Sequence, residues 1–208
     1  MKKLTTTLLS LGLLGLTASQ ALAHFPWINV EDYTPQVGEA PKVTIGWGHR
    51  YPLGSFLQQE SVESIALRGP DGEEIAIKPL NIIELQPEEA LGGEGLYTLA
   101  MERKAGFYTK TTQGGKRQSK EGLDNVLRCS YSHMSAKALL TVGDAQDKLD
   151  TTPANHPLEI IPMVNPATLR AGDYFPVQVL LKGKPYSGMV YATYMGFSTE
   201  KDVFAYTT

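Results

Sequence analysis

The stretch SVESIALRGPDGEEIAIKP, residues 61–79, has the pattern of a β-hairpin. Val62, Ile65 and Leu67 are the apolar members of its first half. Residues 69–72, GPDG, form a strong turn signal, and residues 74–79 follow as a returning strand. The stretch therefore predicts antiparallel β structure.

Similar short runs lie on both sides of this hairpin. Residues 42–47, KVTIGW, alternate apolar residues with polar or small ones, which is the period of a half-buried strand. Residues 95–101 and 106–111 read as two paired strands around a turn at residues 103–106. Two further strands are expected at residues 82–85 and 135–142. Short strands with Gly and Pro turns are typical of an antiparallel β-sandwich, which we expect over residues 24–145.

A second, smaller β unit is expected after a polar linker. Residues 143–155 contain few apolar side chains and mark a domain boundary. Residues 156–208 hold about four strand candidates, whereas a sandwich normally needs about seven. We therefore expect a partial C-terminal β-sandwich domain in a chain that is truncated at Thr208.

The first 23 residues have the pattern of a secretory signal peptide. Lys2 and Lys3 precede an apolar run, and residues 21–23, ALA, form an A-x-A cleavage site. The apolar run is too short for a membrane span. We expect cleavage after Ala23, export to the periplasm and a mature chain that begins with His24.

The charge and cysteine content of the chain limit which partners it can bind and how its fold is stabilised. The formal net charge is -3, and it becomes -5 when Lys2 and Lys3 leave with the leader. This acidic balance without a basic cluster argues against binding of nucleic acid. Cys129 is the only cysteine, so no internal disulfide is possible and the exported fold depends on its core. We read Cys129 as a free thiol or a small buried hydrophobe.

His24, His49 and His133 are the candidate metal ligands. An N-terminal His24 would offer its α-amine and its ring Nδ1 as a chelate for one ion, and the amine has a pKa near 8. His49 follows the expected strand 42–47 in a loop, where sites tend to lie. His133 precedes the expected strand 135–142, so all three would lie at strand ends. The alternative is that these histidines are ordinary terminal or surface residues.

Two weaker signals lie near these candidates. A short helix expected at residues 123–129 would, if extended, place Cys129 and His133 on one face, but a lone C-x-x-x-H is a weak metal motif. His156 is expected to be a surface residue. Three aromatic residues are candidates for the walls of the site or for ordinary core and rim positions: Trp47, Tyr51 and Tyr131.

Hydrolytic machinery is absent from the sequence. It contains no G-x-S-x-G, no H-E-x-x-H and no glycine-rich phosphate loop. We therefore expect a binding protein and not an enzyme.

The chain resembles the periplasmic nickel/cobalt-uptake accessory proteins, a domain-of-unknown-function family similar to periplasmic components of ABC-type cobalt transport. The resemblance spans most of the mature chain and is most specific in its C-terminal part. It is carried by residues 23–27 (AHFPW), 46–49 (GWGH), 135–140 (SAKALL), 158–162 (LEIIP) and 172–185.

The resemblance implies an all-β protein with an Ig-like first domain and a carboxypeptidase-regulatory-like second domain. It also implies a protein that captures Ni2+ or Co2+ and presents it to a membrane metal transporter. Because imidazole also suits Cu2+, two alternatives stay open. One is a copper-binding histidine-brace protein or oxidase, similar to copper monooxygenases, and the other is a metal-free structural or adhesive β-sandwich.

Overall fold

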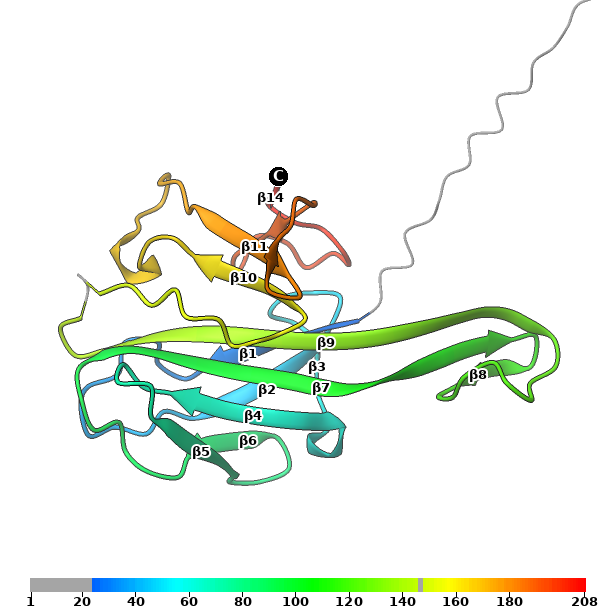
Figure 1. Cartoon of the computed structure of the whole chain (residues 1–208), viewed down its shortest axis with the longest axis horizontal. Coiled ribbons are helices and arrows are strands. Elements are labelled where there is room, and N and C mark those ends of the chain that lie inside the picture. The colour runs from blue at the N-terminus through cyan, green and yellow to red at the C-terminus, as the bar shows by residue number, and fades with distance from the viewer. Residues whose placement is uncertain (1–23, 146–147) are drawn as a thin grey trace, which may run out of the picture.

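The computed structural model describes residues 24–145 and 148–208, and almost all of its regular structure is antiparallel β-strand (Figure 1). Within these residues, no helix is long and apolar enough to cross a membrane. The strands and two 3-10 turns are β1 Phe25–Val30, β2 Val43–Gly48, β3 Ser55–Phe56, η1 Gln59–Ser61, β4 Val62–Arg68, β5 Glu74–Pro79, β6 Glu84–Pro87, β7 Gly95–Thr111, β8 Gly114–Lys116, β9 Val126–Val142, β10 Leu158–Pro162, η2 Pro166–Thr168, β11 Val177–Leu181, β12 Lys184–Pro185, β13 Tyr191–Ala192 and β14 Tyr206–Thr207.

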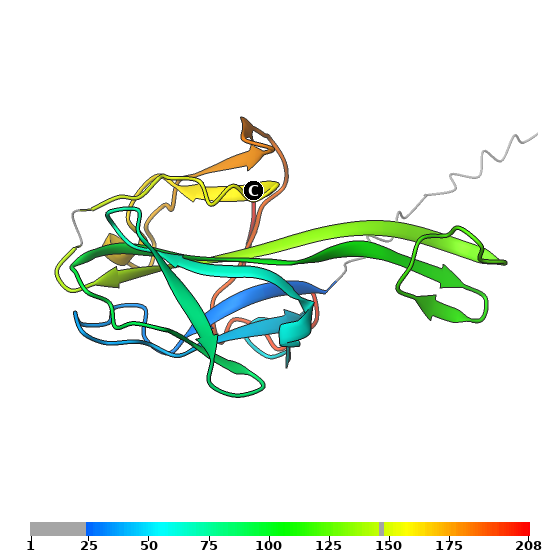
Figure 2. The ribbon, with the colours of Figure 1, turned by 60° about the horizontal axis from the view of Figure 1, so that its bottom comes forward.

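The first part of the chain is one curled antiparallel sheet with the strand order β1-β2-β6-β5-β4-β7. β3 pairs with β2, while β8 and β9 both pair with β7. The sheet curls until β1 lies against β9, as Figure 2 shows. Alternate side chains of β1, β2, β4, β7 and β9 fill the space between the two layers, including Ile28, Ile45, Leu67, Met101 and Leu140. The expected all-β, sandwich-like fold is confirmed.

The hairpin expected at residues 61–79 is present as β4 and β5. Leu67 pairs with Ile75, and Arg68 pairs with Glu74. The turn between them uses Gly72 at a φ of 86°, which is a left-handed conformation that favours glycine.

Two expectations were wrong in the same region. The turn expected at residues 103–106 is the middle of β7, which runs unbroken from Gly95 to Thr111. Arg103 pairs with Met134 and Gly106 pairs with Ser132, so a β-bulge absorbs one extra residue at this point. The pairing with β9 continues past the bulge, and the chain reverses only beyond Thr111.

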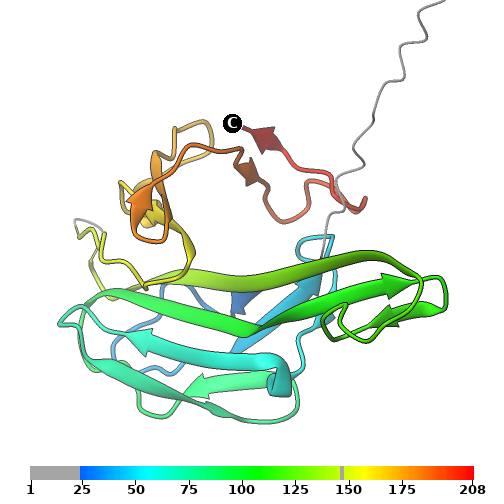
Figure 3. The same cartoon turned by 45° about the vertical axis from the view of Figure 1, so that its right-hand side comes forward.

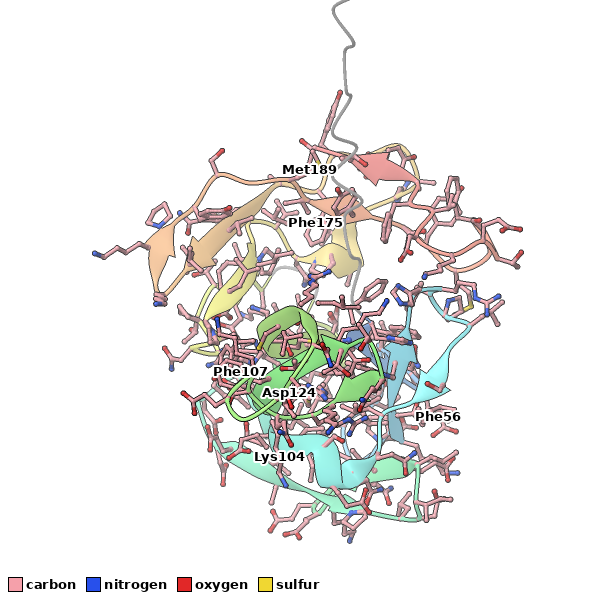
Figure 4. All side chains as sticks on the ribbon, turned by 90° about the vertical axis from the view of Figure 1, so that its right-hand side faces the viewer. Phe56, Lys104, Phe107, Asp124, Phe175 and Met189 are labelled. Carbon is pink, nitrogen blue, oxygen red and sulfur yellow. The ribbon has the colours of Figure 1, made fainter. Side chains whose placement is uncertain are left out.

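The helix expected at residues 123–129 is also wrong, because β9 begins at Val126. Residues 126–134 pair with β7, and these ladder hydrogen bonds override the helical spacing of three apolar residues. The two long strands and β8 form an arm that extends from the body of the sheet (Figure 1). Figure 4 looks along this arm from its tip, with Lys104 and Phe107 of β7 labelled.

The C-terminal unit contains the sheet β10-β11-β12 and the small pair β13-β14. It lies over β9, and its last segment returns toward the start of β1 (Figures 1 and 3). Lys137 of β9 donates a hydrogen bond from Nζ to Oε1 of Glu159 in β10 over 2.8 Å, and both side chains are largely buried. This ion pair attaches the C-terminal unit to the outer face of β9.

Candidate metal site

His24 and His49 are brought together by the register of β1 and β2. Phe25 pairs with Gly48 in this antiparallel ladder, so the residue before β1 and the residue after β2 lie opposite one another. The two imidazole rings have their centroids 4.3 Å apart at an angle of 53°. Two of the three histidines expected to form the site therefore meet at one end of the sheet.

Close packing around Trp27 holds this end of the sheet in place. Trp27 and Ile28 are buried, which anchors the first residues of β1 in the body of the protein. The Trp27 indole lies directly over Gly46 of β2, where a Cβ atom would overlap the ring. A Cβ on Gly54 would lie 2.6 Å from the same ring. The segment that carries His24 therefore rests on a tightly packed base.

Asp202 orients the ring of His49. Nδ1 of His49 lies 2.8 Å from Oδ1 of Asp202, and both side chains are largely buried. The backbone N–H of Asp202 also donates to the carbonyl oxygen of His49 over 3.0 Å. Since a carboxylate only accepts, the neutral ring carries its proton on Nδ1 and its lone pair on Nε2. This is the arrangement in which a carboxylate fixes the tautomer of a metal-binding histidine.

The ring of His24 lies between two other rings. It stacks on Trp47, with centroids 5.5 Å apart and an angle of 11° between the planes, and its neighbour on another side is His49. Burial lowers the pKa of His24 below 6.5, and the electrostatic effects of His49 and Lys201 lower it further, against an opposing effect of Asp202. A neutral ring is the form that binds a metal ion.

His133 does not join this pair, because its side chain leaves β9 on the other face. Successive side chains of a strand point to opposite faces, and the even-numbered residues Ala138 and Leu140 of β9 point into the core. Ser132 and Met134 are also even-numbered, and they line the cavity beside His24. His133 has the opposite parity, and its Nε2 lies 2.7 Å from Oε2 of Glu102. The expectation that His133 lies at the start of a strand was wrong, since β9 begins seven residues before it.

Two weaker expectations were wrong: Cys129 and His133 do not share the face of a helix, and His156 is not at the surface. Cys129 is half-buried in β9, with its Sγ 3.2 Å from Oγ1 of Thr109. Because four residues of a strand span about 13 Å, Cys129 and His133 cannot bind one ion. His156 is buried; it lies between β9 and the C-terminal unit, beside Glu159.

Within residues 24–145 and 148–208, no three His, Cys, Asp or Glu side chains are placed to hold one metal ion. His24 and His49 thus supply two ring nitrogens, and a third nitrogen would be the His24 α-amine. That amine becomes free only if the chain is cut after Ala23. The signal peptide expected at residues 1–23 lies outside the described residues.

Sequence reasoning missed two residues of the site. Asp202 lies 153 positions from His49, and no local pattern points to it. Arg103 has its guanidinium carbon 5.0 Å from the centre of the Trp47 ring. Arg103 follows the buried Leu99 and Met101 at the same two-residue spacing along β7. A charged residue at a position where the pattern expects an apolar one was a signal that the sequence contained.

The aromatic residues named as candidate walls divide into two groups. Trp47 contacts both His24 and Arg103 and therefore forms a wall of the site. Tyr51 packs against Trp27 in the base, with centroids 5.8 Å apart. Tyr131 lies on the arm and packs against Phe107, with centroids 5.0 Å apart.

Fold and site together define an all-β protein that carries a paired-histidine site at one end of a curled antiparallel sheet. The chain belongs to the family described as Domain of unknown function (DUF4198), whose model matches residues 21–208. No curated protein matches the chain.

Proposed function

We propose that the mature chain, beginning at His24, is a periplasmic protein that binds one divalent transition-metal ion. The ligands are the α-amine and Nδ1 of His24 and Nε2 of His49. The observation that carries this proposal is the pair of rings 4.3 Å apart, with the second ring held by Asp202. The bound ion is Ni2+ or Co2+, which the protein captures and presents to a membrane uptake system.

The chemistry of an N-terminal histidine supports this ligand set. The amine and the ring Nδ1 of one residue close a chelate ring on a metal, and an amine with a pKa near 8 loses its proton readily to a metal ion. The second histidine adds its Nε2 because Asp202 occupies its Nδ1. Stacking on Trp47 and burial of Trp27 reduce the freedom that His24 would lose on binding.

The choice of metal rests on the resemblance to nickel/cobalt-uptake accessory proteins, because the ligands alone do not decide it. A nitrogen-rich set binds Cu2+ more tightly than Ni2+, and Ni2+ more tightly than Co2+. The same three nitrogens form the histidine brace of a copper protein, which is the second candidate function. Oxygen-dependent turnover by the copper-loaded protein would favour that candidate, whereas a binding protein shows none.

Calorimetric titration of the mature protein with Ni2+, Co2+, Cu2+ and Zn2+ tests the proposal. We expect one-to-one binding of Ni2+ and Co2+ that is lost in His24→Ala and in His49→Ala. His133→Ala is the matched control, since His133 lies on the other face of β9, and it should bind as the wild type does. Absence of binding with all four metals by protein shown to begin at His24 would refute the proposal.

A further inference from the structure

Basic side chains line both cavities beside the His24–His49 pair, while Asp202 is the acidic group in contact with His49. Two cavities meet at His24 and Trp47. The first, of about 610 Å³, is also lined by His49, Arg50 and Lys201. The second, of about 680 Å³, lies along the inner face of β7 and β9 and is lined by the basic residues Arg103, Lys104 and Arg117.

Most of these cations lack an acidic partner. None of the ion pairs in the described part of the chain involves Arg50, Arg103, Lys104 or Arg117. Glu60 is the only carboxylate that lines the second cavity. Since the whole chain has a formal net charge of -3, this excess of positive charge is local and not a consequence of composition.

Arg103 has unused hydrogen-bonding capacity at the inner end of the second cavity. Its Nε is buried and makes no hydrogen bond, while one terminal nitrogen donates to the carbonyl oxygen of Lys104 over 3.3 Å. Burial and the nearby charge of Arg117 lower the pKa of Arg103. A buried donor without an acceptor destabilises the protein, and an anion in the cavity that accepts from Arg103 would relieve that cost.

The basic residues that line the two cavities favour an anionic cargo over a bare divalent cation. They repel a bare ion and so weaken its binding. A divalent metal ion that is bound by a tricarboxylate such as citrate carries net negative charge and is attracted instead. Trp47 lies next to both groups, because its ring stacks on His24 and its centre is 5.0 Å from the guanidinium carbon of Arg103.

We propose that the cargo of this site is an anionic metal chelate, whose metal ion binds His24 and His49 and whose carboxylates bind Arg103 and Arg117. This inference rests on the proposed function and names its substrate class. The guanidinium group matches a carboxylate with two parallel hydrogen bonds. A cavity of about 680 Å³ has the size of a small-molecule site and accommodates a di- or tricarboxylate or an amino acid.

Equilibrium dialysis with two labels tests the inference. The mature protein is dialysed against nickel chloride, against nickel with radiolabelled citrate, against nickel with radiolabelled histidine, and against each chelator without metal. We expect the wild type to retain nickel and citrate together in a one-to-one ratio and to retain little citrate alone, whereas the nickel–histidine complexes, which carry no negative charge, should be retained less well. The Arg103→Gln/Arg117→Gln variant should lose at least tenfold in affinity for the chelate while still binding nickel from the chloride.

Two controls make the result decisive. Arg128→Gln removes an exposed arginine of β9 that does not line the cavity, and it should leave retention of the chelate unchanged. Arg117→Gln alone changes an exposed residue, which should leave the fold intact, so a loss of chelate seen there is due to the lost charge. Nickel retained from the nickel–citrate mixture without the citrate label, or full retention of the nickel–citrate chelate by the double variant, would overturn the inference and leave the proposed function standing. No retention of nickel in any form would overturn both.

Discussion

Nδ1 of His49 lies 2.8 Å from Oδ1 of Asp202, although 153 positions separate the two residues in the chain. This hydrogen bond joins the C-terminal segment to the end of β2. Phe204 lies against Phe25 beside it, with centroids 6.2 Å apart, so the contact is not confined to one atom pair. The ring of His49 and the Phe25–Phe204 contact therefore connect this end of the sheet to the C-terminal segment.

Replacement of Asp202 by alanine should weaken metal binding about 10- to 100-fold, because the ring of His49 loses the group that sets its tautomer and orientation. Titration with Ni2+ measures the effect. Glu200→Gln is the matched control, since Glu200 is exposed in the same segment and makes only a backbone hydrogen bond to Ser198. An Asp202→Ala protein that binds as tightly as the wild type would show that Asp202 does not act on the site.

A single extra residue before His24 should weaken metal binding greatly. The extra residue converts the α-amine into an amide, which would have to be deprotonated before it could bind the ion. Mass spectrometry of the exported protein should find His24 at its N-terminus, and calorimetry should then compare it with a Met-His24 form. Equal affinity of the two forms would rule out the terminal chelate.

Gly46→Ala should destabilise the protein by about 1–3 kcal/mol, because the new methyl group overlaps the Trp27 indole in a packed region. Urea unfolding measures the change. Gly106→Ala is the matched control: Gly106 also lies in a strand, and a Cβ there meets nothing within 4 Å. A loss of stability in the control as large as that of Gly46→Ala would mean that the effect comes from β-propensity and not from Trp27.

Acid should destabilise the fold through His156. Burial lowers the pKa of His156 below 6.5. Glu159 and Glu102 act to raise this pKa, whereas Lys137 and His133 act to lower it further. Below pH 6.5, His156 therefore binds a proton more readily in the unfolded chain than in the folded chain. The free energy of unfolding falls as the pH decreases from about 6.5 to the lower pKa of the folded state, and His156 contributes no slope above pH 6.5.

Urea unfolding of wild type and His156→Gln between pH 7.5 and 5 checks this sign. As the pH decreases, the free energy of unfolding should fall more for the wild type than for His156→Gln. A difference that stays constant over this range would show that His156 keeps an ordinary pKa in the fold.

Local patterns in the sequence determined the β class and several of its elements. The period-2 alternation of residues 42–47 and the GPDG turn at residues 69–72 predicted β2 and the β4–β5 hairpin, because both depend on neighbours in the chain. The leader pattern before His24 stays a prediction, and with it the free amine on which the proposed site depends.

Only the tertiary structure decided how these elements form a site. β7 runs through its expected turn because β9 supplies a ladder partner from elsewhere in the chain. The β1–β2 register sets His24 against His49, and the parity of β9 turns His133 away from them. Asp202 reaches the site from the C-terminal segment, and Arg103 reaches it from β7. A linear pattern records which side chains neighbour each other along one strand, whereas a metal site depends on which strands meet in space.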